Sequence, residues 1–232
     1  MVIDAGVPGY QRLEEGVQAA ASANRQFEVV ILDPRRDGIQ QITDALAGHQ
    51  GIEALHILSH GTAGAVQLGS TWLNAQDLPS YRSAIAGWNS ALAEDADLLL
   101  YGCDVAAGEK GAGFIASLAA LTGADVAASD DPTGASQLGG DWDLEARVGT
   151  IETATVASGL AQQGWNGLLA PLTVSTTNDV LDGTTTSIAT LVANPGADGK
   201  ISLREAIIAA NNTIGADTIS LPAGTYRLTI PG

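Results

Sequence analysis

The sequence predicts an α/β fold over its first two-thirds, built as a mostly parallel sheet flanked by helices. Short apolar runs alternate with helical patterns, as they do in βαβ units. The runs are continuous rather than alternating, which is typical of parallel strands covered on both faces. Turn residues separate the units, as at Asp33-Pro34, Ser59-His60-Gly61 and Gly102.

The elements follow one another in a regular order. The expected strands cover residues 2–4, 27–32, 54–58, 98–101 and 125–128. The expected helices cover residues 10–21, 38–47, 81–93 and 112–122. In the first helix, Leu13, Val17 and Ala20 recur at helical spacing. Glycines at 139–140 and 149, with apolar residues between them, indicate a closing β-hairpin over 139–151. We place this domain at residues 1–167.

A second unit follows at residues 168–232. Helical patterns stop there, and Thr, Asn, Asp and Gly dominate. One helical patch covers 202–211, and 217–229 indicates two short strands around Pro222-Ala223-Gly224. We expect a linker followed by the incomplete start of another domain. Both ends of the chain look cut, so we expect it to be part of a longer protein.

Composition limits the classes of function. The 232 residues include 26 acidic and 10 basic side chains, a net charge of −16. This balance argues against nucleic acid as a partner and fits a secreted or surface protein kept soluble by negative charge. No apolar run reaches the ~20 residues of a membrane helix, so we expect no membrane insertion. A single cysteine leaves no intramolecular disulfide.

Reactive side chains follow two of the expected strands. Strand 54–58 exits through His60-Gly61, and strand 98–101 exits through Gly102-Cys103. Ligands gather outside the carboxyl ends of parallel strands, so His60 and Cys103 are expected at one edge of the sheet. A neighbouring imidazole raises the thiolate fraction of a cysteine, as nucleophilic catalysis requires. The N–H groups of Gly61 and Cys103 are candidates for an oxyanion hole.

Other interpretations of these residues stay open. A cysteine at a strand end is often a core residue, so a structural role for Cys103 stands beside the catalytic one. His56 lies four residues before His60, as a metal site would need. It also lies inside an apolar run with no further ligand pattern, and a hydrogen-bonded core histidine is the better interpretation. We therefore predict no metal ligand among these residues.

Four more side chains are candidates for a substrate cleft: Asp33, Asp104, Ser129 and Asp130. All lie at or just after strand ends, and each has an alternative role as a turn or cap residue.

Ca²⁺ is the one ion that the sequence brings into consideration, and we expect no other cofactor. The run Ser129-Asp130-Asp131 offers oxygen ligands. Residues 194–205 have EF-hand spacing, with Gly199 sixth and Glu205 twelfth, although a glycine occupies the third position. A cap helix over the same residues is the competing interpretation.

The strand-end residues resemble a known family. Ser59-His60-Gly61, then 101–106 (Tyr-Gly-Cys-Asp-Val-Ala) and 140–145 (Gly-Asp-Trp-Asp-Leu-Glu), resemble DUF4347, a domain of unknown function from large secreted bacterial adhesin-like proteins. More broadly, the two strand exits resemble caspase- and gingipain-like (clan CD) cysteine peptidases. That resemblance implies a caspase-like sheet, a Cys103 nucleophile, a His60 general base and a polypeptide substrate. Gly-Cys-Asp departs from the caspase context Ala-Cys-Arg, so cleavage after aspartate does not follow.

The second unit resembles another family. The run 202–207 (Ser-Leu-Arg-Glu-Ala-Ile) resembles the CSLREAI region, which begins right-handed β-helix domains of secreted bacterial proteins; Ile201 replaces its cysteine. This implies a short cap helix and the first strands of a β-helix. The two resemblances together lead us to expect a cysteine endopeptidase domain of a secreted or cell-surface bacterial protein, with its own chain as one substrate. The alternative is a catalytically inactive caspase-like module for folding, targeting or binding.

Overall fold

The computed structural model describes residues 1–20, 27–156, 165–213 and 218–230. The chain forms two compact units, Met1–Ala170 and Pro171–Gly232. Residues 168–170, which the sequence assigned to the linker, therefore lie with the first unit. None of the helices in the described ranges is long and apolar enough to cross a membrane.

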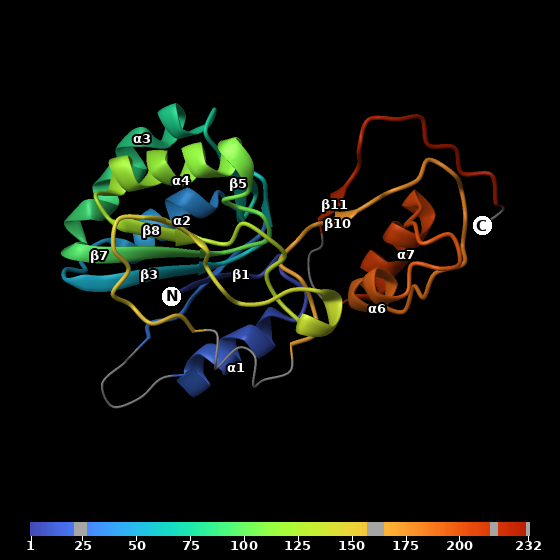
Figure 1. Ribbon diagram of the computed structural model, residues 1–232, viewed down its shortest axis with the longest axis horizontal. Helices are drawn as coiled ribbons and strands as arrows, with labels where there is room; N and C mark the ends of the chain where they lie inside the picture. The colour runs from blue at the N-terminus through green and yellow to red at the C-terminus, as the bar shows by residue number, and fades with distance from the viewer. Residues whose placement is uncertain (21–26, 157–164, 214–217, 231–232) are drawn as a thin grey trace. The chain divides into compact units, whose positions relative to one another are not determined.

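A six-stranded sheet forms the centre of the first unit (Figure 1). Its strands, in spatial order, are β2 (Val30–Leu32), β1 (Val2–Asp4), β3 (Ile52–Leu58), β7 (Leu92–Tyr101), β8 (Asp125–Ala128) and β9 (Ala146–Val148). All neighbours pair in parallel except β8 and β9. The predicted mostly parallel sheet is confirmed.

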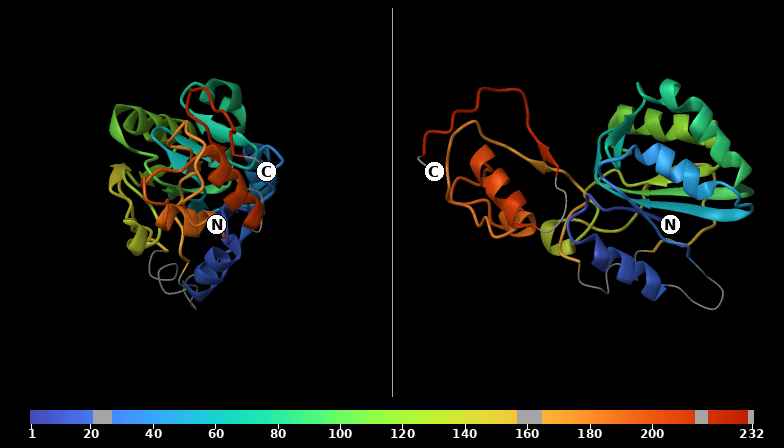
Figure 2. Two further views of the ribbon diagram at one scale, coloured as in Figure 1. Left: turned by 90° about the vertical axis from the view of Figure 1, so that its right-hand side faces the viewer. Right: turned by 180° about the vertical axis from the view of Figure 1, so that it is seen from behind.

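Helices cover both faces of this sheet. Helix α1 (Tyr10–Ala20) lies on one face, and α2 (Gly38–Leu46), α3 (Leu78–Gly87) and α4 (Gly108–Thr122) lie on the other (Figures 1 and 2). Two apolar layers result, because every central strand has a buried residue on each face. Leu100 packs with the three-helix side, whereas Leu99 and Tyr101 pack on the α1 side.

Local sequence signals set the helix ends. Asp37 accepts hydrogen bonds from the N–H groups of Ile39 and Gln40, which caps the start of α2. Helix α4 ends at Gly123, whose φ of 73° is a left-handed conformation that suits glycine.

Three features of the first unit differ from the sequence-based expectation. A small antiparallel sheet of β4 (Gly61–Thr62), β5 (Ala65–Leu68) and β6 (Thr71–Asn74) occupies residues for which no strand was expected. The helix expected at 81–93 is α3, which begins earlier, at Leu78, and ends earlier, at Gly87. It ends there because residues 92–101 form the central strand β7. The hairpin expected over 139–151 is wrong, because β9 pairs with β8 and its Ala146 and Val148 pack against the core.

Within its described residues, the second unit contains two helices and one pair of strands. Strands β10 (Leu172–Thr173) and β11 (Ile219–Ser220) pair in parallel, and the helices are α6 (Ile188–Ala193) and α7 (Leu203–Asn212). Their apolar side chains form a separate core that includes Leu191, Ala206 and Ala209.

A buried carboxylate organises the start of α7. The Ser202 hydroxyl accepts from the Glu205 N–H, and Glu205 Oε2 accepts from the Ser202 N–H at 2.9 Å, a capping box. Glu205 Oε1 also accepts from the N–H groups of Asp182 and Gly183 at 2.9 and 2.8 Å. Burial alone would raise the pKa of Glu205, but these N–H bonds together lower it. Both oxygens are thus engaged, which favours the cap-helix interpretation over an EF-hand.

The residue before it, Arg204, ties α7 to the surrounding loops. Its guanidinium binds both carboxylate oxygens of Asp179, at 2.7 and 3.0 Å. The same carboxylate accepts from the backbone N–H groups of Thr229 and Ile230. The Arg204 hydrogen bond, followed by these N–H bonds, lowers the pKa of Asp179. The Arg-Glu pair of the 202–207 run therefore has a structural role in this unit.

Replacing Glu205 should loosen the second unit. A Glu205→Ala variant leaves three N–H groups without their acceptor, which costs at least about 1 kcal/mol. We expect faster hydrogen exchange of the amides at 182–183 and 202–205, measured by mass spectrometry. Asn211→Ala, a change on the exposed face of the same helix, is the control and should leave these rates unchanged. Equal exchange in both variants would contradict the assigned role.

Candidate functional site

His60 and Cys103 leave the sheet at equivalent positions on neighbouring strands. In the β3–β7 register Leu58 lies opposite Tyr101, and the Ser59 N–H donates to the Tyr101 carbonyl at 3.0 Å. His60 lies two positions after Leu58, and Cys103 lies two positions after Tyr101. The structure therefore brings both to one stretch of the sheet's carboxyl edge.

Two glycines let the strand exits come together. A Cβ on Gly61 would lie 2.6 Å from the Cys103 carbonyl oxygen and 2.8 Å from the Gly102 carbonyl carbon. A Cβ on Gly102 would lie 2.9 Å from the Ser59 carbonyl oxygen. Real Cβ contacts are longer than this, so the two backbones can touch only where side chains are absent.

The close approach makes two N–H groups converge on one oxygen. Gly61 N–H donates to the Leu169 carbonyl oxygen at 2.8 Å, and Cys103 N–H donates to the same oxygen at 3.0 Å. Two backbone donors at this distance from one carbonyl oxygen have the geometry of an oxyanion hole. The sequence predicted the donor pair but not the acceptor.

The Cys103 thiol is covered. It is 1% exposed and bonds to the Thr133 backbone, accepting from the N–H at 3.1 Å and donating to the carbonyl at 3.5 Å. Burial raises the pKa of Cys103 to about 12, opposed by the Thr133 N–H and reinforced by the charge of Asp104. In this state the thiol is protonated at neutral pH and shielded from reagents.

His60 is buried and neutral. The residue is 3% exposed, and this burial lowers the pKa of its imidazole to about 4. A hydrogen bond with the Gly6 backbone acts in the opposite direction and raises that pKa. Among the described residues, its Nδ1 has no hydrogen-bond partner. A neutral imidazole with a free nitrogen can accept a proton, as a general base must.

A segment of the chain itself covers the site. Leu169 N–H donates to the Thr133 carbonyl at 2.9 Å, and Ala135 N–H donates to the Gly167 carbonyl at 2.9 Å. Leu168 and Gly134 form an antiparallel bridge between these bonds. Residues 167–169 thus lie along 133–135 as a short added strand.

Apolar contacts anchor this covering segment. The Leu169 side chain is fully buried in the apolar layer that also holds Cys103, Trp142 and Trp165. The two tryptophan rings lie 5.8 Å apart, and Trp165 Nε1 donates to the Pro8 carbonyl at 2.9 Å. Sequence reasoning missed Thr133 and Leu169, because both act through backbone atoms and leave no side-chain pattern to find.

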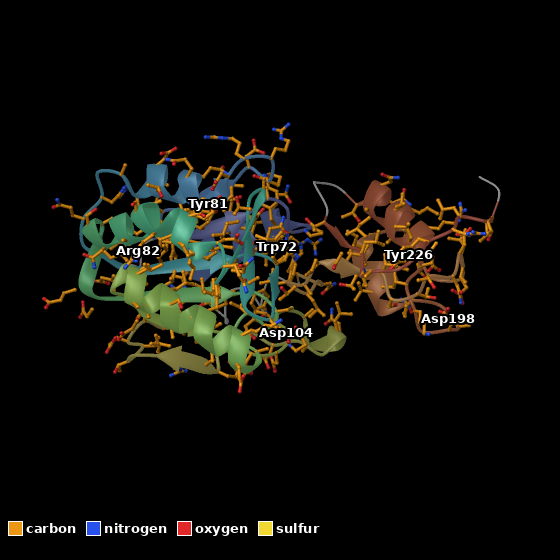
Figure 3. All side chains as sticks on the ribbon, turned by 90° about the horizontal axis from the view of Figure 1, so that it is seen from above. Trp72, Tyr81, Arg82, Asp104, Asp198 and Tyr226 are labelled. Carbon is orange, nitrogen blue, oxygen red and sulfur yellow. The ribbon has the colours of Figure 1, made fainter. Side chains whose placement is uncertain are left out.

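Asp104 directly follows Cys103 in the sequence. Its φ of 60° makes it the one non-glycine residue with a positive φ in the described ranges, so the backbone bends sharply right after Cys103. Its N–H donates to the Asp131 carbonyl at 2.9 Å, and burial followed by the charge of Asp130 raises its pKa. Figure 3 shows Asp104 on the loop that leaves β7.

Ser129 and Asp130 shape the neighbouring loop after β8. Ser129 Oγ donates to the Asp131 carbonyl at 2.9 Å, and the Ser129 carbonyl accepts from Ala106 N–H at 2.8 Å. The Asp130 N–H donates to Glu145 at 3.1 Å. These bonds tie together the loops that follow β7 and β8, which matches the turn interpretation.

The Asp131 carboxylate lies in an acidic cluster on that loop. One oxygen each from Asp131, Asp141 and Glu145 lie within 4.8 Å of one another, a spacing that a cation would accept. Burial and the charge of Asp141 raise the pKa of Asp131.

Asp33 and His56 lie apart from this constellation. Asp33 follows β2 at the outer edge of the sheet and pairs with Arg35 at 3.1 Å, which lowers the pKa of its carboxyl. His56 is buried in mid-strand, with Nδ1 3.3 Å from the Tyr101 hydroxyl and its ring stacked on that side chain. Asp33 is thus a turn residue, and His56 has the core position that the sequence favoured.

A cavity of about 350 Å³ opens at the opposite edge of the sheet. Its lining includes Val2 and Ile52 at the amino ends of β1 and β3, and His56 from the middle of β3. Chemistry in parallel sheets gathers at the carboxyl ends, and none of the lining residues belongs to the His60–Cys103 site. The cavity is therefore not part of the candidate site.

Adding one methyl group at Gly61 should disrupt the site. A Gly61→Ala Cβ would meet Val105 Cγ2 at 2.5 Å as well as the 103 backbone, so we expect destabilisation of about 1–3 kcal/mol in urea unfolding. Gly113→Ala is the matched control, because no atom lies within 4 Å of its Cβ and alanine favours a helix. Similar stability of the two variants would refute the close approach.

Acid should weaken the first unit partly through His60. The folded-state pKa is lowered from 6.5 to about 4, so this stabilisation is complete above pH 6.5 and is lost as the pH falls through 4. The loss amounts to about 3 kcal/mol. Urea unfolding near neutral pH and near pH 4 should give a smaller acid loss for His60→Gln than for the natural chain. His49→Gln, at an exposed histidine, should behave like the natural chain. An identical loss in all three proteins would contradict a buried neutral His60.

Comparison with known proteins identifies the family of the chain. No curated protein and no solved structure matches the chain. The family described as "Domain of unknown function (DUF4347)" matches residues 1–169. The match runs from the first strand to Leu169, the residue whose carbonyl meets the two N–H groups, and it covers well over half of the chain. The protein belongs to the DUF4347 family.

Proposed function

We propose that the first unit is a cysteine endopeptidase domain with His60 and Cys103 as its catalytic dyad. One observation carries the proposal: two N–H groups, from Gly61 and Cys103, meet on a single peptide carbonyl beside the only thiol of the chain. A hole of this kind binds the oxyanion that forms when a thiolate adds to a peptide bond. A buried, neutral His60 nearby along the same sheet edge supplies the base.

The mechanism follows from these groups. His60 takes the thiol proton, and Cys103 Sγ attacks the carbonyl carbon of the peptide. The Gly61 and Cys103 N–H groups stabilise the charge on the carbonyl oxygen. The C–N bond then breaks as the imidazolium returns its proton to the leaving nitrogen. Water, deprotonated by His60, hydrolyses the thioester and restores the thiol.

The caspase-like relationship belongs to this proposal. The paired exits His-Gly and Gly-Cys on adjacent parallel strands support it, as does the added strand at 167–169. Asp104 follows the nucleophile where caspases have arginine, so cleavage after aspartate does not follow from this relationship.

We also propose that the domain belongs to a secreted or cell-surface bacterial protein that continues into a right-handed β-helix. The net charge of −16 fits such surroundings. The capped helix α7 and the parallel pair β10–β11 fit the first turn of a β-helix.

One set of contacts favours the second candidate, an inactive module for folding, targeting or binding. The thiol bonds to Thr133 and is buried, and a thiol held permanently in this state is inert. The two candidates differ in whether the covering segment ever leaves Cys103.

The test looks for peptide bonds cleaved by the protein. The purified chain is incubated with casein at several pH values between about 6 and 9, and new N-termini in either protein are identified by mass spectrometry. We expect cleavage that Cys103→Ala abolishes and His60→Gln slows at least about 100-fold. His49→Gln is the matched histidine control and should keep full activity. Cleavage that is absent, or that survives Cys103→Ala, would leave the inactive module as the function.

A further inference from the structure

We infer that the peptide bond between Leu169 and Ala170 is the substrate of this site, so that the domain cuts its own chain there. The inference rests on the proposed function and adds to it the bond and the side chain recognised. The carbonyl in the hole identifies the bond. A cysteine peptidase holds the oxygen of the scissile carbonyl between its two donors, and both donors here hold the Leu169 oxygen.

The acyl side of this bond is bound as a substrate strand would be. Two backbone hydrogen bonds, from Leu169 to Thr133 and from Ala135 to Gly167, fix the register of 167–169. Strand addition of this kind gives affinity through the main chain and leaves specificity to the side chains.

The side chain before the bond has a closed apolar site. Leu169 is 0% exposed and shares its layer with Trp142 and Leu144, so an aliphatic side chain is what this position accepts. A carboxylate there would lose its water without gaining a partner in that layer.

The leaving side lies where the first unit ends. The family match stops at Leu169, and the compact unit stops one residue later, at Ala170. Cutting between them would release an intact domain of residues 1–169 and a fragment of residues 170–232. Of the first unit, only the half-buried Ala170 would leave with the smaller fragment.

The reaction balances with water as the one co-reactant. Cys103 Sγ forms a thioester with the Leu169 carbonyl carbon while the bond to the Ala170 nitrogen breaks, and the thiol proton passes through His60 to that nitrogen. Water then adds to the thioester carbon and the C–S bond breaks. The products are a Leu169 carboxylate, a free Ala170 amine and the original thiol.

The described state is the one before the cut. The thiol still bonds to Thr133, and the bond to be cleaved is already in the hole. A rotation of the Cys103 side chain away from Thr133 and toward the Leu169 carbonyl carbon is the movement that starts the reaction.

The experiment follows the whole chain by intact-mass spectrometry and sequences the new N-terminus. We expect two fragments whose masses sum to the chain plus one water, with Ala-Pro-Leu-Thr at the start of the smaller one. The rate constant of fragment formation should be independent of protein concentration, because the substrate is part of the same molecule. Cys103→Ala should leave the chain intact.

Two variants on the leaving side separate an effect on the cleaved bond from an effect on folding. Ala170→Pro turns the leaving nitrogen into a ring nitrogen and should reduce cleavage at least about 100-fold. Pro171→Ala changes the next residue, keeps an ordinary peptide bond at 169–170 and should be cut at a similar rate. Circular dichroism checks that both variants are folded.

The outcomes separate this inference from the proposed function. Fragments ending at Leu169 that need Cys103 support both. Cleavage that needs Cys103 but occurs only in casein, or at another bond of the chain, overturns the inference and leaves the peptidase function standing. Cleavage at 169–170 in the Cys103→Ala variant overturns the inference, and the absence of any cleavage that needs Cys103 overturns both.

Discussion

The site depends on the contact between two backbone stretches, 59–61 after β3 and 101–103 after β7. That contact is possible because Gly61 and Gly102 have no side chains, and it places two N–H groups within 3.0 Å of one oxygen. The parallel register of β3 and β7 makes the two strands end at the same level of the sheet. The fifteen-residue helix α4 then connects β7 to the neighbouring strand β8. The sheet thus builds the hole from main-chain atoms alone.

The same contact links the filled hole to the burial of the thiol. The oxygen that occupies the hole belongs to the segment that buries Cys103, so the segment must be in place for the hole to be filled and the thiol covered. Its four backbone hydrogen bonds contribute about 0.5–1.5 kcal/mol each, and burial of the Leu169 side chain contributes about 1.5–3 kcal/mol. A cover held by several kcal/mol leaves the open form a small fraction of the population.

The sequence predicted the parts of this structure that depend on side-chain patterns. The five buried strands were found because continuous apolar runs mark parallel strands, and His60, Gly61 and Cys103 were found because they follow two of those runs. The small β4–β5–β6 sheet was missed because Ala65–Leu68 and Thr71–Asn74 are too short and mixed to stand out. Thr133 and Leu169 could not be predicted, since their backbone atoms contact Cys103 across sequence separations of 30 and 66 residues, which only the fold closes.

Unsatisfied polar atoms lie at the candidate site. In the described part of the chain, His60 Nδ1, Thr133 Oγ1 and Asp97 Oδ1 are buried side-chain atoms without a hydrogen-bond partner. The first two belong to His60 and to the residue that holds the thiol. Each such atom costs about 1–3 kcal/mol, and an apolar side chain of similar shape would remove that cost in a module that serves only as a fold. A base that must accept a proton needs a free nitrogen, so under the proposed function the cost at His60 has a chemical reason.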